Sequence, residues 1–123
     1  MKRDMELIRK ILLSVEAGES SDSIVGFSAD AIKYHQSLAI EAGLLKGKAL
    51  KYLENGTEIP SDVAITGLTW DGHEFIELIK RSEVWSTIQT SFKEESFSTI
   101  VQVAKDLAAG WAKKKVGEIL NKN

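Results

Sequence analysis

The feature that most constrains the fold is the stretch from residue 28 to residue 75, which carries start and stop signals for two helices. Ser28 is a suitable N-cap for the first helix, because its hydroxyl can accept a hydrogen bond from a backbone N–H of the first turn. Gly43 ends that helix, since glycine adopts the left-handed conformation at a helix end without strain. Thr69 is a suitable cap for the second helix, which we expect to run to about Lys80.

Two strand-like segments separate these helices, at residues 44–53 and 63–68. Between them, Asn55-Gly56 is typical of the tight turn that joins antiparallel strands. Gly67 interrupts the second segment and is a candidate β-bulge. The order of a helix, a two-stranded ribbon and a helix predicts the core of a winged helix.

The segment before this core departs from the standard helix-turn-helix pattern. Residues 2–17 have apolar side chains at helical spacing, which predicts a first helix that ends at Gly18. Residues 23–27 are too few for a second full helix, and we expect a short strand or a turn there. A standard helix-turn-helix protein has a positioning helix at this place, so the usual docking in a DNA groove is in doubt.

Helical spacing continues beyond residue 80. Ser82 is a candidate cap for one further helix, and Ser96 or Ser98 for the last one. The fold class is therefore α+β, mostly α: helix, short strand, helix, β-hairpin wing and helix, followed by C-terminal helices. We expect a winged-helix domain at residues 1–80 and, at residues 81–123, a helical extension packed on the core or on a partner subunit.

The last helix carries an apolar stripe that is long for a helix packing on so small a core. Tryptophan is enriched at interfaces, so the stripe is a candidate surface for a homodimer. Its residues are Ile100, Ala104, Leu107 and Trp111. Trp70, Trp85 and Trp111 are otherwise expected to be core anchors.

The composition limits the class of function. The chain of 123 residues has no cysteine, which excludes disulfides and thiolate metal sites. No apolar run approaches the roughly 18 residues of a membrane span, and no signal peptide is apparent. We therefore expect a cytoplasmic protein without membrane contact. No nucleophile–base pair and no phosphate-cradling glycine loop is visible, so we expect neither an enzyme nor a cofactor or metal site.

The charge is divided unevenly along the chain. Residues 1–80 contain nine lysines and arginines against thirteen aspartates and glutamates, whereas the remainder contains seven against five. The part that resembles a DNA-binding fold is thus acidic. Because phosphate contacts supply much of the affinity for nucleic acids, this balance counts against strong generic DNA binding.

Two blocks of sequence resemble known families. Residues 34–45, together with Leu68-Thr69 and Gly72-His73-Glu74-Phe75, resemble the signature of winged helix-turn-helix regulators, in which the recognition helix ends in Ala-Gly-Leu. With the opening residues 1–13 and the later Val84-Trp85, the chain resembles a bacterial and phage-associated domain of unknown function (number 2513). The resemblance implies a winged-helix-like fold and a phage or prophage context, and it implies no specific activity.

If the helix that begins at Ser28 enters a major groove, its outward side chains and the lysines of the wing would contact DNA. The candidate residues are Lys33, Tyr34, Ser37, Lys46, Lys48 and Lys51. The alternative is that they are ordinary solvated side chains, since the charges of this region nearly cancel. His35 lies on the apolar face, where a hydrogen-bonded core histidine is expected rather than a catalytic one.

Two hypotheses for function follow. The first is a DNA-binding transcriptional regulator of a phage or prophage, with double-stranded DNA as its partner. The second is a non-enzymatic protein–protein interaction module that keeps the winged scaffold and does not bind DNA. A continuous positive surface around Lys33, Lys46 and Lys48 favours the first, and a mixed surface with an exposed apolar groove favours the second.

Overall fold

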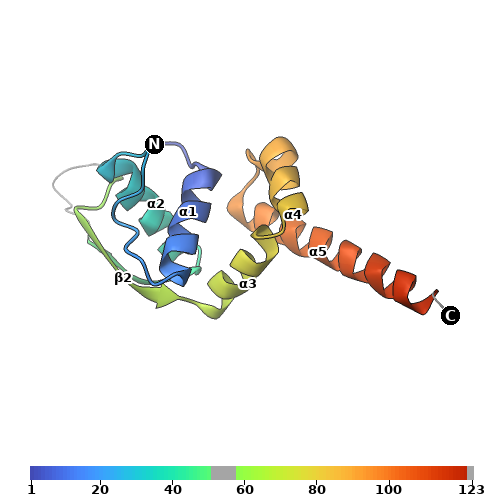
Figure 1. Cartoon of the computed structure of the whole chain (residues 1–123). Helices are drawn as coiled ribbons and strands as arrows, with labels where there is room; N and C mark the ends of the chain where they lie inside the picture. The colour runs from blue at the N-terminus through green and yellow to red at the C-terminus, as the bar shows by residue number, and fades with distance from the viewer. Residues whose placement is uncertain (51–57, 122–123) are drawn as a thin grey trace. The chain divides into compact units, whose positions relative to one another are not determined.

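In the computed structural model of the chain, residues 1–50 and 58–121 are described. They form an α+β, mostly helical fold that divides into unit 1 (Met1–Ile76) and unit 2 (Glu77–Asn123) (Figure 1). The elements are α1 (Met5–Glu16), α2 (Ala29–Glu41), β1 (Leu45–Leu50), β2 (Asp62–Leu68), α3 (Trp70–Ile79), α4 (Ser82–Thr87), η2 (Ile88–Phe92) and α5 (Phe97–Leu120). Within the described residues, no helix combines the length and apolar character needed to cross a membrane.

Helix α1 begins later than the sequence pattern predicts, because Asp4 caps it. The Asp4 carboxylate accepts hydrogen bonds from the backbone N–H groups of Glu6 (2.9 Å) and Leu7 (3.4 Å). The helix ends as predicted at Gly18, which has a φ of 76°. Its buried side chains are Met5, Leu7, Ile8, Ile11 and Leu12.

Of the two alternatives for residues 23–27, the short strand is wrong and the turn is confirmed. The Phe27 N–H donates to the Ile24 carbonyl (3.3 Å), and Gly26, the third residue of the turn, has a φ of 92°. A positive φ at this position is typical of a type II turn, for which glycine is preferred. The turn reverses the chain within four residues, so no stretch of it is extended enough to pair with a sheet.

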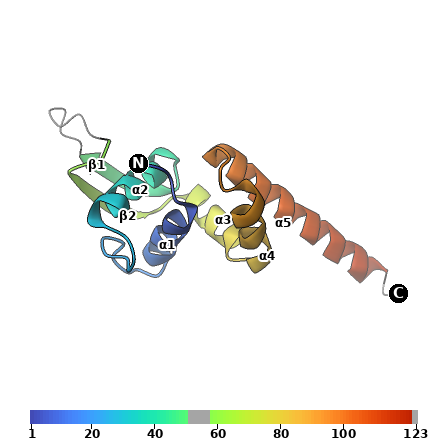
Figure 2. The same cartoon turned by 90° about the horizontal axis from the view of Figure 1, so that it is seen from above.

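Helix α2 lies inside unit 1. It packs against α1 and against both strands (Figures 1 and 2). Ser28 caps it as predicted, with its hydroxyl oxygen accepting from the Ala31 N–H (3.1 Å), and Gly43 ends it with a φ of 77°. Its buried residues are Ile32, His35, Gln36, Ser37 and Ala39.

Strands β1 and β2 pair antiparallel, with Lys46 opposite Gly67 and Gly47 opposite Ile65. Thr66 is therefore an extra residue in β2, which confirms the bulge predicted near Gly67. The predicted Asn55-Gly56 turn lies outside the described residues, as does the last part of the predicted strand at residues 44–53.

Helix α3 is joined to the end of α2 by a close backbone contact. The Thr69 hydroxyl accepts from the Gly72 N–H (2.9 Å), which confirms Thr69 as the cap, and donates to the Gly43 carbonyl (2.5 Å). A Cβ atom at Gly72 would collide with the Leu44 carbonyl. Glycine at residue 72 is thus what allows the start of α3 to approach this backbone.

Unit 2 consists of helices packed around a small apolar core. The Trp85 N–H donates to the Arg81 carbonyl (3.0 Å), so Arg81 is the cap of α4, and the prediction of Ser82 as cap is wrong by one residue. Ser96 caps α5 and accepts from the Thr99 N–H (3.2 Å), which decides between the two predicted serines. The buried core residues are Ile79, Val84, Ile88, Ile100 and Ala104.

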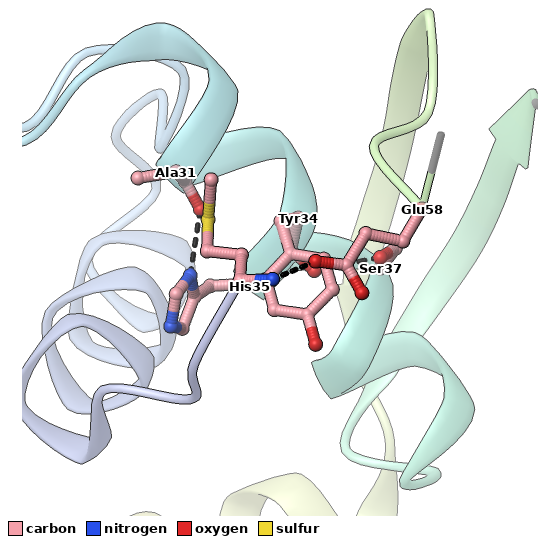
Figure 3. Close-up of polar contacts among 6 residues, drawn as sticks. Ala31, Tyr34, His35, Ser37 and Glu58 are labelled. Atoms are coloured by element: carbon pink, nitrogen blue, oxygen red, sulfur yellow. Dashed lines mark hydrogen bonds and ion pairs between the residues drawn. The ribbon is translucent and has the colours of Figure 1, made fainter. Parts of the chain in front are cut away.

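His35 fastens the start of α1 to α2. Its Nε2 atom accepts a hydrogen bond from the Asp4 backbone N–H (2.8 Å), and its Nδ1 atom lies 2.7 Å from the Ala31 carbonyl (Figure 3). Because a backbone N–H can only donate, Nε2 must be unprotonated and Nδ1 must carry the hydrogen. Burial lowers the pKa of His35 below its ordinary value of 6.5, with a smaller contribution from Arg3 and against opposing effects of Ala31 and Asp4.

We expect the free energy of unfolding to fall as the pH decreases through 6.5, the ordinary pKa of histidine. In this range the unfolded chain gains a proton that the folded protein does not yet bind, and the loss ends below the folded-state pKa of His35, where both states are protonated. The measurement is the urea midpoint between pH 8 and pH 5, with the His35→Gln variant expected to show a shallower decline. Equal slopes for wild type and His35→Gln would contradict this account.

Candidate interaction surface

Helix α2 offers little open surface to a ligand. Within Ala29–Glu41, all of which the structure describes, the exposed residues are Ala29, Asp30 and Glu41, and no other residue is more than partly exposed. Both exposed charges are negative. A helix that reads DNA normally presents basic and polar side chains to the groove, so this exposed surface is unsuited to phosphate contact.

The three DNA candidates on α2 are engaged inside the protein. Lys33 is half-buried, and its Nζ atom donates to the Ser61 carbonyl (3.2 Å). The Tyr34 ring packs edge-on against His35 at a centroid distance of 5.3 Å. Ser37 is only 2% exposed and donates to the Tyr34 carbonyl at 2.6 Å (Figure 3), so the expectation that it faces outward is wrong.

The lysines of the ribbon are placed differently. Lys46 and Lys48 are exposed on one face of β1, where Leu50 is also exposed to 61%. Across the sheet, Leu50 lies opposite the exposed Asp62. The face is therefore mixed in character, with two lysines beside an apolar and an acidic side chain. Lys51, the third candidate of the ribbon, lies outside the described residues.

Trp70 is the largest apolar side chain on the surface of unit 1, exposed to 76%. It is the first residue of α3 and is followed by the exposed Asp71 and Glu74. We call the exposed surface formed by Trp70, Asp71 and Glu74 on α3 the Trp70 face.

The expectation that Trp70 is a core anchor is wrong, because most of its side chain is exposed. The spacing of residues along α3 indicates that the Trp70 side chain is exposed. Successive residues of a helix are rotated by about 100°, so residue 70 lies roughly opposite residue 72. Gly72, Phe75 and Ile76 are buried on the inner side of α3. Trp70 consequently projects outward.

The predicted dimer stripe on α5 is partly used inside unit 2. Ile100 and Ala104 are buried, and α5 packs there against α4 and η2. Leu107 and Trp111 are half-buried. The exposed apolar side chains of this helix lie further along it, at Val116, Ile119 and Leu120. Self-association remains a proposal, and Ile100 and Ala104 are unavailable for it in this structure.

Among residues 1–50 and 58–121, no three histidine, aspartate or glutamate side chains are grouped so that they could hold a metal ion.

The family described as "Hypothetical protein (DUF2513)" matches residues 2–98. A relative from Haemophilus influenzae (strain ATCC 51907 / DSM 11121 / KW20 / Rd), named "Uncharacterized protein", is 31% identical over 114 residues, which cover 88% of this chain and 92% of the relative. No solved structure matches the chain.

We expect the Lys33 side chain to stabilise unit 1 through its hydrogen bond to the Ser61 carbonyl. We expect Lys33→Met to lower the free energy of unfolding by about 1 kcal/mol, because it removes the hydrogen bond to the Ser61 carbonyl. Lys48→Met, at an exposed position of β1, should change it by less than about 0.5 kcal/mol. Urea unfolding of both variants makes the comparison. An equal and negligible effect of the two substitutions would show that Lys33 is not held by this contact.

Proposed function

The chain belongs to the DUF2513 family, as residues 1–13 and 68–75 indicated, and we propose that it is a non-enzymatic protein-interaction module on a winged-helix-like scaffold. The order of α1, α2, the antiparallel strands β1 and β2, and α3 supports this scaffold. In it, α2 takes the place of the recognition helix and the strands take the place of the wing.

The observation that carries the proposal is the exposed indole of Trp70. Tryptophan is among the residues that contribute most to protein–protein affinity, and 76% of this side chain reaches solvent. Exposing the large apolar surface of a tryptophan to water is unfavourable. A partner that covers the indole removes this cost. The Trp70 face therefore has the central anchor that a protein interface needs.

The charges around Trp70 indicate the chemistry of the partner. The carboxylates of Asp71 and Glu74 follow the indole on α3. Acidic residues attract lysine and arginine, and a guanidinium or ammonium group can also stack on the indole. We infer a partner that presents a basic side chain next to an apolar one.

Reading of DNA by α2 has less support than protein binding. The exposed charges of α2 are those of Asp30 and Glu41, and Lys33 is held by the Ser61 carbonyl. Like charges repel, so α2 would approach a phosphate backbone only against an electrostatic barrier.

A DNA-binding phage or prophage regulator remains the second candidate, because Lys46 and Lys48 are exposed on one face of β1. They could contact phosphates without help from α2. Such contacts position a protein on DNA but carry no sequence information by themselves. This candidate therefore predicts weak, salt-sensitive and non-specific binding.

The Trp70 face can be tested in cells that encode the protein. A photo-crosslinking amino acid in place of Trp70 should yield a discrete protein adduct, because the partner covers this side chain. The same amino acid in place of Asp30, which is exposed on α2, serves as the matched control and should yield none. An adduct at residue 30 without one at residue 70 would contradict the proposal.

Once that partner is identified, Trp70→Ala should weaken its binding by about tenfold or more, as expected for an interface anchor. The substitution should leave the free energy of unfolding within about 0.5 kcal/mol of wild type, because the indole is exposed. Undiminished affinity of Trp70→Ala would remove Trp70 from the interface.

A further inference from the structure

The outer edge of β2 is the feature of unit 1 that the proposed function does not yet use. In the part of the chain that the structure describes, the sheet has the order β1–β2, so β2 has a neighbouring strand on one side only. The segment at residues 23–27, for which a short strand or a turn was expected, is a turn. An edge strand of this kind presents backbone N–H and C=O groups to any extended chain that reaches it.

A cavity of about 480 Å³ lies along this edge. One wall consists of five consecutive residues of β2, Val63–Gly67, and the other consists of Gly18–Asp22, with Val15 contributing from α1. Side chains of a strand alternate between its two faces. A cavity lined by five successive residues therefore follows the edge of the strand rather than one face of the sheet.

A second cavity of about 200 Å³ continues the first one. It is lined by residues that include Asp62 and Lys33, and it shares Asp22 and Val63 with the larger cavity. Together the two cavities border β2 from Asp62 to Gly67. At about 3.3 Å per residue, this edge is roughly 20 Å long, which suits an extended segment of about six residues. We call the two cavities together the β2-edge groove.

The wall opposite β2 is held in place by α2. The Gln36 side-chain amide donates to the Ser21 hydroxyl (2.9 Å) and to the Asp22 carboxylate (3.0 Å). Ser21 is only 5% exposed, and the Glu19 N–H donates to the Ser14 carbonyl (2.9 Å). These contacts fasten residues 19–22 to the two helices, so the groove has two fixed walls.

The side chains of the groove indicate what it would accept. Carboxylates line it at Glu19, Asp22 and Asp62, and its lysine, Lys33, has its ammonium group on the Ser61 carbonyl. Apolar side chains line it at Val15, Val63 and Ile65. An extended chain placed there would meet both carboxylates and apolar groups, which suits alternating basic and apolar residues.

We propose that the β2-edge groove binds an extended, lysine- or arginine-containing segment of a partner protein, which adds to the sheet as a strand beside β2. In this mode the main-chain hydrogen bonds supply affinity, and the alternate side chains supply specificity. The inference deepens the proposed function, on which it rests, by assigning a second contact region and the backbone conformation of its ligand.

The test uses a fluorescent peptide of about eight residues in which valine and lysine alternate, titrated into the full chain at low salt and followed by anisotropy. We expect saturable binding. Two peptides that are N-methylated at every second residue, in opposite registers, distinguish strand addition from simple charge attraction. Only alternate residues of an edge strand bond to their neighbour, so one register should lose about tenfold or more in affinity and the other should lose little.

Protein variants locate the bound peptide. Glu19→Gln with Asp62→Asn should weaken binding by about threefold to tenfold and reduce its dependence on salt. Glu118→Gln, which removes an exposed carboxylate on α5, is the matched control and should bind as wild type does. Equal losses in both N-methylated registers, equal losses in the groove and control variants, or no binding at all would overturn the inference. The peptide modifications test it even if a protein variant fails to fold.

The Trp70→Ala variant distinguishes a failure of the proposed β2-edge groove from a failure of the proposed interaction through the Trp70 face. It should leave peptide binding in the β2-edge groove unchanged, because the Trp70 face is not part of the groove lining. If crosslinking at residue 70 succeeds and the peptide does not bind, the groove is wrong and the interaction module stands. If the peptide binds and residue 70 gives no adduct, the Trp70 face is wrong and the groove stands.

Discussion

In unit 1, the consecutive polar residues His35, Gln36 and Ser37 of α2 are all buried, and each of these side chains has a hydrogen-bond partner within the chain. Buried polar groups are tolerated only when they are paired, and a paired set fixes the arrangement of the segments that supply it. His35 holds the residue before α1, and Gln36 holds the connection that follows α1. The positions of α1 and of residues 19–22 thus depend on the burial of these α2 side chains in unit 1.

This burial decides which surfaces remain for function. A recognition helix must stand out from its domain to enter a groove, whereas α2 exposes mainly its two ends. The surfaces that stay open are the Trp70 face at the α2–α3 junction, the lysine-bearing face of β1 and the groove along β2. Two of the three are lined by carboxylates and apolar side chains. Both of these surfaces could therefore contact a basic protein segment.

The parts of the fold that could be predicted from the sequence are those fixed by local chemistry. Ser28, Thr69 and Gly43 act as predicted, because a cap or a helix stop depends on a few neighbouring residues. The burial of Ser37 and the exposure of Trp70 could not be predicted from neighbouring residues alone. They depend on which side of each helix meets the rest of the protein.

The turn at residues 23–27 illustrates the same limit. Its Ile-Val pair favours a strand by composition, yet Gly26 takes a positive φ and Val25 is 95% exposed. A strand needs a neighbour to pair with, and the hydrogen bonds of Gln36 hold the preceding residues on α2 instead. Tertiary contacts thus override a local preference at this point, and the edge of β2 stays open as a consequence.

The most direct test of the central claim, that α2 is a structural helix and not a DNA-reading one, is a titration of labelled duplex DNA with the full chain at low salt. Electrostatic attraction to phosphates is strongest at low salt, so the titration should detect binding by any phosphate-binding surface. We predict no saturable binding, or only weak binding with a dissociation constant of roughly 100 µM or above. The Lys46→Met, Lys48→Met double variant should abolish any such weak binding. Sequence-dependent binding with a submicromolar dissociation constant would contradict it.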